Sequence, residues 1–193
     1  VVTESTYGNR QHERGDVIEA LGKVIDRTVQ RGGTVVIPAF AVGRAQALIY
    51  DLWRLRQRGG LRNVPVFLDS PMAANATQLL HKHQQDHRLS RHDFEAACAD
   101  VSYVREVEES KSLSSNRYPK VIISASGMAT GGRVLHHLAA FAPDRRNTLL
   151  FSGFQAAGTR GRKLLEGARE VKIYGQWIPV KAEVTELPML SAH

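Results

Sequence analysis

A carboxylate and an imidazole stand near the opposite ends of this chain of 193 residues. Glu4 opens a Glu-Ser-Thr-Tyr-Gly run, Tyr7, Arg10 and His12 follow closely, and His193 ends a Ser-Ala-His run. Carboxylates and imidazoles are standard partners in proton transfer at phosphates. If the two act together, the fold has to bring both ends into one cleft. The chain starts on an apolar Val-Val-Thr without an initiator Met, so we expect it to be part of a longer protein.

Three further segments share a design suited to phosphate. Each segment follows an apolar, strand-like run, contains small residues, and has an Arg near the predicted start of a helix. The three segments span residues 38–44, 124–133 and 152–160. Small residues let a ligand approach the backbone, and helix N-termini favour anions. Ligands of open parallel sheets bind at the carboxyl ends of the strands, where all three loops are expected to meet. The sequence therefore predicts a rim for several phosphates.

Ordinary tight turns are the alternative for each loop taken singly. Residues 127–132 do not form a Walker A loop, since no Gly-Lys-Ser/Thr follows, and they do not match Gly-x-Gly-x-x-Gly. A Rossmann-like enzyme with a nucleotide cofactor is therefore disfavoured.

The run from His81 to His87 almost matches the His-x-His-x-Asp-His motif of dinuclear zinc hydrolases. Asp86 and His87 come one residue late, and the segment continues a helical pattern from Met72. On a helix, His83 and His87 would share a face and could hold an adventitious metal. We expect a solvated polar helix end.

Two other polar sites have structural interpretations. Asp69 or Ser70 is expected to cap the helix that Pro71 begins. In the adjacent pair His136 and His137, one ring is expected to pack inside and the other to face water, with a role toward substrate open for one of them.

Composition restricts the class of protein. The hydrophobic fraction of 42% suits one domain with a full core, and the net charge is +7, with Arg supplying nineteen of the 26 basic residues. Arg pairs with phosphate oxygens in bidentate fashion, so the bias indicates a polyanionic partner, although a GC-rich genome and a solvated surface are the alternative. Cys98 is the only cysteine, which excludes an internal disulfide and indicates a reducing, cytoplasmic setting. No apolar run reaches the roughly 20 residues of a membrane span.

The elements that must position these residues alternate in type. Apolar β-branched runs predict strands, and spacings of three and four residues predict helices between them. The expected fold class is α/β, with a mostly parallel sheet flanked by helices and a C-terminal hairpin leading out. An exposed loop with one short helix is expected over 106–117. The predicted strands are 34–38, 64–68, 101–105, 120–124, 148–152, 171–174 and 178–187.

Taken in order, these motifs resemble the β-CASP nucleases, RNA- and DNA-processing members of the metallo-β-lactamase superfamily. The resemblance rests on Glu-Ser-Thr-Tyr-Gly-Asn-Arg at positions 4–10, Phe-Ala-Val-Gly-Arg at 40–44, Asp-Ser-Pro-Met at 69–72 and Ser-Gly-Met at 126–128. Gly-Phe-Gln at 153–155, Gly-Thr at 158–159 and the final Ser-Ala-His continue it. The branch of bacterial and archaeal RNA exonucleases and mRNA 3′-end endonucleases is the most similar.

The resemblance implies specific roles. Glu4 would be the motif A acid and His193 the motif B histidine, both at a centre of two zinc ions in the full-length protein. Residues 1–193 would be the cap domain, with 1–8 and 186–193 joining a metallo-β-lactamase domain that carries the metal ligands outside this chain. The residues expected to contact RNA phosphates are Tyr7, Arg10, Arg44, Ser126, Gly127, Met128, Gly131, Gly132, Gln155, Thr159 and Arg160.

The expected function is therefore that of the RNA-binding cap of a zinc-dependent ribonuclease. Its partner would be single-stranded RNA, with DNA as an alternative, and no metal is expected in this chain, so the isolated chain should not hydrolyse RNA. An RNA-binding module without catalysis is the second hypothesis. Two segments depart from the family pattern: Arg160 replaces a hydrophobic residue, and Met189-Leu190 replaces Gly-Phe before the final Ser-Ala-His.

Overall fold

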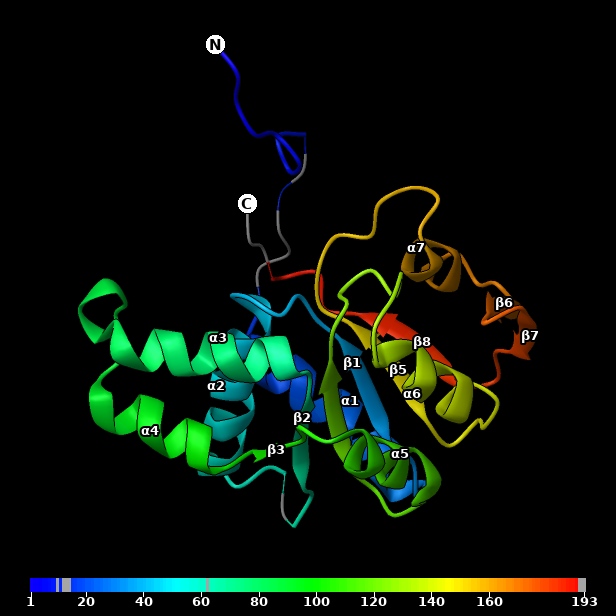
Figure 1. Ribbon diagram of the computed structural model, residues 1–193, viewed down its shortest axis with the longest axis horizontal. Coiled ribbons are helices and arrows are strands. Elements are labelled where there is room, and N and C mark those ends of the chain that lie inside the picture. Colours follow the sequence, from blue (N-terminus) through cyan, green and yellow to red (C-terminus); the bar gives the residue numbers. More distant parts are fainter. Residues whose placement is uncertain (10, 12–14, 62, 191–193) are drawn as a thin grey trace.

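Six short parallel strands form the sheet at the centre of the computed structural model (Figure 1). The structure describes residues 1–9, 11, 15–61 and 63–190. The strand order is β3-β2-β4-β1-β5-β8, and every neighbouring pair is parallel. The strands are β1 (Val35–Pro38), β2 (Val66–Asp69), β3 (Ser102–Tyr103), β4 (Val121–Ser124), β5 (Thr148–Phe151) and β8 (Glu183–Glu186).

Helices cover both faces of this sheet. Because side chains alternate along a strand, Val35 and Ile37 enter one core while Val36 enters the other. The helices α1 to α4 contribute to the first core and α5 to α7 to the second. The predicted α/β class is confirmed. The helix bounds are α1 (Val17–Gln30), α2 (Arg44–Gln57), α3 (Pro71–Lys82), η1 (Gln84–Asp86, a 3-10 turn), α4 (Arg91–Ala99), α5 (Val107–Ser115), α6 (Val134–Phe141) and α7 (Arg160–Leu165).

The predicted C-terminal hairpin is present, and the chain then returns to the sheet. β6 (Glu170–Ile173) and β7 (Gln176–Pro179) pair antiparallel, and β8 follows beside β5. The single strand predicted over 178–187 is therefore wrong. The break occurs where the amides of Lys181 and Ala182 both donate to the carbonyl of Ala142, at 2.8 and 2.9 Å.

The last strand is also tied to the first helix. Glu183 accepts from Arg31 at 2.8 Å and from Arg27, both on α1. The hydrogen bonds from these two guanidinium groups, acting against partial burial, hold the pKa of Glu183 below its usual range. The fold is thus closed by a contact between residues more than 150 positions apart.

The helical continuation predicted through His87 does not occur. α3 ends at Lys82, and the side chain of Ser90 accepts from the amide of Asp93 at 3.0 Å to start a separate helix, α4. His83 and His87 therefore do not share a helical face. The ring of His87 instead packs on Phe94, with centroids 5.4 Å apart.

The segment 106–117 is more helical than predicted, because α5 occupies most of it. Glu109 accepts from the amides of Arg105 and Glu106, which caps the helix, and Leu113 packs into the core.

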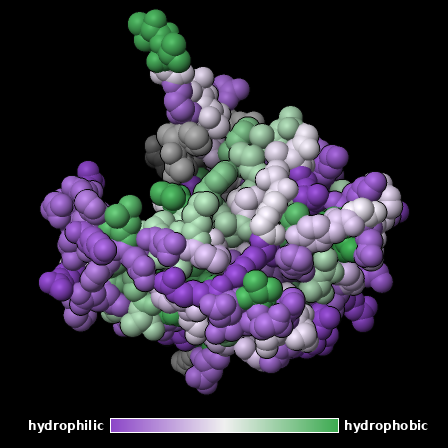
Figure 2. Space-filling model, viewed as in Figure 1, coloured by the Kyte–Doolittle hydropathy of each residue, from purple (hydrophilic) through white to green (hydrophobic). Residues whose placement is uncertain are grey.

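The first and last parts of the described chain leave the body on the same side (Figure 1). Gly15 lies against Met189, since a Cβ built on Gly15 would be 3.5 Å from the Met189 side chain. The apolar N-terminal end projects from the body, where hydrophilic side chains gather toward the sides and the bottom of the view and less polar ones lie in the middle (Figure 2). Among the described residues, the helices are all too short or too polar to span a membrane.

Candidate functional site

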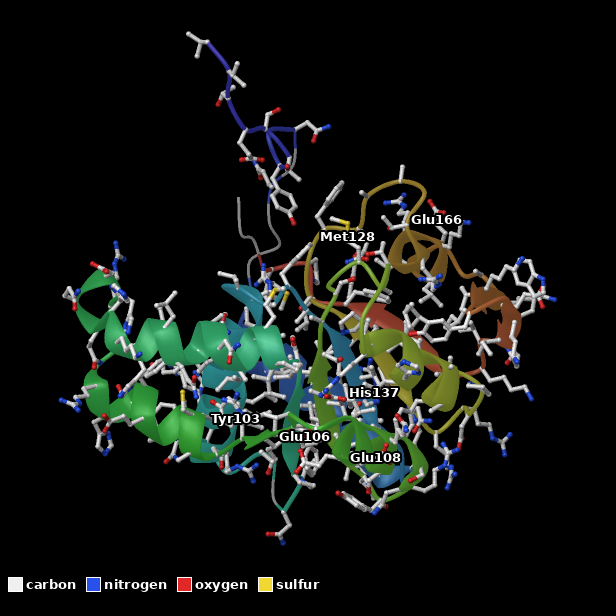
Figure 3. The ribbon with its side chains drawn as sticks, in the orientation of Figure 1. Tyr103, Glu106, Glu108, Met128, His137 and Glu166 are labelled. Atoms are coloured by element: carbon white, nitrogen blue, oxygen red, sulfur yellow. The ribbon has the colours of Figure 1, made fainter. Side chains whose placement is uncertain are left out.

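The three loops predicted to bind phosphate meet at one edge of the sheet; we call residues 38–44, 124–133 and 152–160 the rim. They follow β1, β4 and β5, and β1 lies between the other two strands. Since the strands are parallel, their carboxyl ends lie at the same edge. In Figure 3, Met128 lies at this edge, above the sheet, while His137 lies deeper in the body.

Backbone contacts lock the three loops together. A Cβ on Gly127 would lie 2.9 Å from the amide nitrogen of Phe40, so only glycine lets these two loops approach so closely. The side-chain amide of Gln155 donates to the carbonyls of Gly127 and Gly153, both at 3.0 Å. The amide of Gly161 donates to the carbonyl of Met128 at 3.0 Å. The rim is therefore one preorganised surface.

The Gly-rich loop 124–133 is closed by its own polar groups. Gly132 has a φ of +75°, and a Cβ there would lie 2.9 Å from the carbonyl of Ala125. Ser126 Oγ accepts from the amide of Thr130 at 3.1 Å, and the two hydroxyl oxygens are also 3.1 Å apart. A Cβ on Gly131 would meet nothing among the described residues within 4 Å.

The rim holds three of the six buried side-chain atoms that have no hydrogen-bond partner in the described part of the chain. They are Arg44 Nε, Ser152 Oγ and Gln155 Oε1, and their residues are all at least nine-tenths buried. The other three atoms belong to Gln84 and His87, between α3 and α4. A buried polar group with no partner costs free energy, so native proteins rarely retain one without a reason. An arginine donor and a hydroxyl are groups that bind phosphate oxygens.

Arg44 is the most informative of the three. It begins α2, is 6% exposed, and its Nε lies 3.9 Å from the position of a Cβ on Gly153. Burial lowers the pKa of its guanidinium, while electrostatic interactions with Tyr7 and Asp51 oppose that shift. Burial raises the pKa of Asp51 to about 6, although the charges of Arg54 and Arg44 act to lower it. The positive charge of Arg44 is thus incompletely compensated, as expected for an anion-binding group.

A cavity of about 180 Å³ adjoins the rim. Tyr7, Phe154, Gln155 and Arg162 are among the residues that line it. The rings of Tyr7 and Phe154 meet edge to face with centroids 6.2 Å apart, which brings the N-terminal segment to the third loop. Tyr7 therefore lies beside the rim, and its contact with an RNA phosphate stays a prediction.

Thr159 and Arg160 have local partners. Thr159 caps α7, accepting from the amide of Arg162 at 3.2 Å and donating to Ala156 at 2.6 Å. Arg160 donates through Nε and Nη2 to the carbonyl of Lys172, at 3.0 and 2.8 Å, and through Nη1 to the carbonyl of Ala129. A phosphate contact by either residue stays a prediction.

The predicted catalytic pair is only half described. Glu4 is exposed in the projecting N-terminal segment, and its carboxylate accepts from the amide of Thr6 at 2.5 Å. His193 and the predicted phosphate ligand Arg10 lie outside the described residues, as does His12. The roles of Glu4 and His193 stay predictions.

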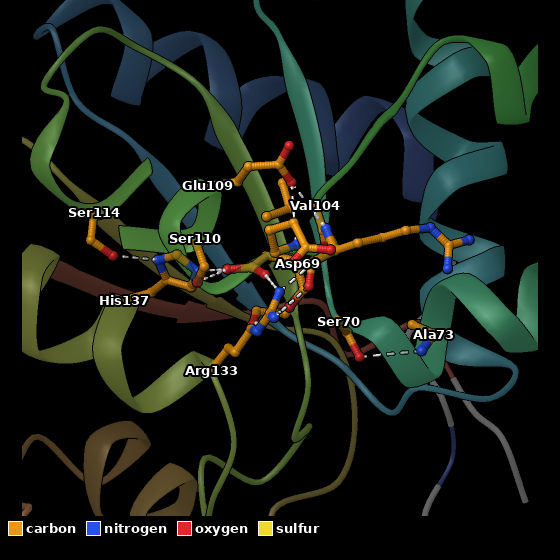
Figure 4. Close-up of polar contacts among 12 residues, drawn as sticks. Asp69, Ser70, Ala73, Val104, Glu109, Ser110, Ser114, Arg133 and His137 are labelled. Atoms are coloured by element: carbon orange, nitrogen blue, oxygen red, sulfur yellow. Dashed lines mark hydrogen bonds and ion pairs between the residues drawn. The ribbon is translucent and has the colours of Figure 1, made fainter. Parts of the chain in front are cut away.

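A second polar cluster, the Asp69 cluster (Asp69, Ser110, Ser114, Arg133 and His137), lies inside the body (Figure 4). Asp69 Oδ1 accepts from Arg133 at 2.7 Å, and Oδ2 accepts from Ser110 and from His137 Nε2, the latter at 2.6 Å. His137 Nδ1 lies 3.0 Å from the hydroxyl of Ser114. Burial alone would raise the pKa of the Asp69 carboxyl, but hydrogen bonds from His137, Ser110 and Arg133 hold it below its usual range.

This cluster was missed by sequence reasoning, although three of its members, Asp69, Arg133 and His137, were noticed separately. The helix cap is Ser70, which accepts from the amide of Ala73 at 3.2 Å, so Asp69 is free for its buried partners. His137 is the inner ring of the predicted pair and His136 the exposed one. Arg133 also donates to the carbonyls of Val104 and Arg105, which fastens the end of the Gly-rich loop to β3. The sequence signals were the Asp that ends a predicted strand, the Arg that ends the Gly-rich loop and the adjacent His pair.

The described residues contain no group of three or more His, Cys, Asp or Glu side chains that could hold a metal ion. The donor set of this part of the chain therefore does not fit a zinc centre.

Comparison with known proteins identifies the family of this chain. The model of the Beta-Casp domain family matches residues 45–164, which is more than half of the chain. A protein of Thermus thermophilus named as a ribonuclease is 37% identical over 203 residues, covering 100% of this chain and 46% of the relative. An RNase J-like protein of Methanocaldococcus jannaschii is 33% identical over 197 residues, with the same shares, 100% and 46%.

A transcription termination factor, FttA, of Methanosarcina mazei is 36% identical over 187 residues, covering 91% of this chain and 29% of the relative. The chain thus spans less than half the length of these relatives. The resemblance seen in the motifs is confirmed by the match over the central loops and helices. The chain belongs to the β-CASP domain family.

Proposed function

We propose that this chain is the RNA-binding cap of a ribonuclease that hydrolyses phosphodiester bonds. The observation that carries the proposal is the buried, incompletely compensated Arg44 at the meeting point of three loops. The chain's net charge of +7 favours a polyanion over a neutral ligand. The names of the relatives, ribonuclease and RNase J-like protein, support RNA as the substrate.

In this proposal the rim holds backbone phosphates of single-stranded RNA. Arg44 donates to a phosphate oxygen through its guanidinium group. Because the loops are already fastened to one another, little ordering free energy is spent on binding. The two zinc ions expected of the parent protein would be held by residues outside this chain.

The proposal gives Glu4 and His193 the chemical roles. His193 stabilises the charge that develops on the phosphate or protonates the leaving oxygen, and Glu4 orients His193. In the full-length parent protein, His193→Ala and Glu4→Ala should each cut the rate of RNA cleavage strongly, by a factor of about 100 or more. Full cleavage by either variant would remove these roles.

Binding to the rim can be tested on this chain alone. We expect Arg44→Met to weaken the binding of a fluorescein-labelled single-stranded RNA by roughly ten- to 100-fold, because a charge-assisted hydrogen bond contributes about 1.5–3 kcal/mol. The measurement is fluorescence anisotropy at fixed salt. The matched control is Arg91→Met on α4, an exposed arginine that pairs with Glu95 at 2.9 Å. Equal affinities for the two variants would contradict the proposal.

The isolated chain is expected to bind RNA and not to hydrolyse it. Metal-dependent cleavage by the purified chain would contradict the assignment of the metal ligands to another part of the parent protein. If the parent binds RNA but does not cleave it, the second hypothesis, an RNA-binding module without catalysis, is correct.

A further inference from the structure

The hairpin β6–β7 carries a second surface with features of nucleic-acid binding, next to the rim. Between it and α7 lies a hollow of about 290 Å³, the hairpin groove, lined by Thr130, Thr159, Lys163, Glu170, Lys172 and Trp177 among others. Thr130 and Thr159 belong to the rim loops. The groove is therefore continuous with the rim.

An exposed aromatic ring forms one wall of the groove. Trp177 is 61% exposed, although tryptophan is usually well buried. It is paired across the hairpin with Lys172, while the neighbouring pair, Val171 and Ile178, faces the core. The alternation of the two strands therefore places an indole and an ammonium group side by side on the outer face.

The charges of the groove favour an anion. Lys163 and Lys172 are exposed, and Arg160 contributes a guanidinium that is already bonded to two carbonyls, against the single carboxylate of Glu170. Basic residues beside an exposed aromatic ring are typical of surfaces that bind single-stranded nucleic acid, where bases stack on the ring and phosphates lie near the cations.

The groove is also held in a fixed position relative to the rim. Arg160 bridges the carbonyl of Ala129, in the Gly-rich loop, and the carbonyl of Lys172, on β6. At the outer end, the hydroxyl of Tyr174 lies 3.1 Å from His136 Nε2, which fastens the hairpin turn to α6. A strand of RNA that occupies the rim would therefore meet a groove that needs no rearrangement.

We propose that the hairpin groove binds single-stranded RNA that extends beyond the rim, with one base stacked on Trp177 and a phosphate beside Lys172. The proposal rests on the proposed function, because it takes the RNA on the rim as its starting point. It assigns to the hairpin the role of an auxiliary binding site that lengthens the contact with substrate.

The chain offers a direct optical test. Its two tryptophans are Trp177 and Trp53; the latter lies on α2 with its ring 5.6 Å from that of Tyr50, and belongs to the core on the other face of the sheet. Trp53→Phe leaves Trp177 as the only indole, and Trp177→Phe leaves Trp53. Titration with a twelve-residue oligouridylate should quench the fluorescence of the first variant to saturation and leave that of the second unchanged.

Affinity is the second measurement. Trp177→Ala should weaken the binding of the same oligouridylate by roughly five- to 100-fold, the effect of losing one stacked base. Lys172→Gln should reduce the slope of log affinity against log salt concentration by about 1, because one fewer cation contacts a phosphate. Both side chains are exposed, so the variants should unfold at the same denaturant concentration as the parent chain.

The outcomes separate this proposal from the proposed function. If Arg44→Met weakens binding but Trp177→Ala does not, and Trp177 is not quenched, the groove proposal is overturned and the surface is left to a protein partner, while the rim keeps its function. If the unaltered chain binds no oligouridylate at all, the proposed function fails and the groove proposal fails with it.

Discussion

The Asp69 cluster and the rim are built from the same kinds of side chain and use them in opposite ways. In the Asp69 cluster, one buried carboxylate receives hydrogen bonds from an arginine, a histidine and a serine. At the rim, Arg44 is buried with an Nε that has no hydrogen-bond partner among the described residues. The first arrangement is complete and stabilises the fold, whereas the second leaves binding capacity for something from outside.

The largest expected effect comes from breaking the Asp69 cluster. Asp69→Ala leaves the guanidinium of Arg133 without its carboxylate in a largely buried site, and we expect the free energy of unfolding to fall by about 3–5 kcal/mol. Urea denaturation followed by circular dichroism measures the change. Asp93→Ala on the partly exposed start of α4 is the control. If the free energy of unfolding fell by less than about 1 kcal/mol, the Asp69 cluster would not be a main source of stability.

Unlike Asp69→Ala, Arg44→Met is not expected to lower the free energy of unfolding. Removing an incompletely compensated buried charge should leave the free energy of unfolding unchanged or raise it by about 1 kcal/mol, because the desolvation cost disappears. The same denaturation experiment measures it, alongside the loss of RNA affinity described above. A large destabilisation would mean that Arg44 belongs to the fold, like Asp69, and the contrast would collapse.

The rim should nevertheless depend on its backbone. Gly132→Ala places a Cβ at a φ of +75° and 2.9 Å from the carbonyl of Ala125, so we expect a loss of about 1–3 kcal/mol in unfolding free energy. Gly131→Ala, at the adjacent position with open space around it, should change stability by about 0.5 kcal/mol or less. Similar effects at both positions would contradict the fixed geometry of the loop.

The last expected effect is a difference in the pH dependence of stability. The lowered pKa of Asp69 means that its contribution to stability is present at neutral pH and is lost as pH falls. The pKa of Asp51, raised to about 6, acts oppositely: the folded state binds this proton more tightly, so stability falls as pH rises from about 4 to about 6.

Asp51→Asn should therefore flatten the stability profile between these pH values and raise stability above pH 6. Denaturant unfolding at half-unit pH intervals measures the profile, with Asp26→Asn on α1 as the exposed control. An unchanged profile in the Asp51 variant would show that burial does not raise the pKa of Asp51 as expected.

The sequence predicted what depends on local patterns. Apolar runs located the strands, and the parallel order that brought the three loops together followed from the alternation of strands and helices. Helix α4 was missed because only Phe94 and Ala97 of its residues are buried, which leaves a weak periodicity in a His-rich stretch. The break before β8 was missed because it depends on a carbonyl of α6's end, Ala142, almost 40 residues earlier.

The partners of polar side chains likewise could not be predicted from local sequence patterns. Arg44 and Arg160 look alike in sequence, since each begins a helix after a Gly-containing loop, yet one has an unpartnered buried nitrogen and the other bonds two carbonyls. Asp69 and His137 are 68 positions apart, and no local pattern relates them. Spacing can propose which residues are reactive, while the partners that satisfy them are decided by packing.

The attachment of β8 to β5 and of Glu183 to α1 has a consequence for synthesis. A nascent chain that has not yet emerged past residue 186 exposes the edge of β5, and the two arginines of α1 lack their carboxylate. The domain can therefore reach its final form only after residue 186 has left the ribosome. Until then, an open sheet edge is accessible to chaperones and to other nascent chains.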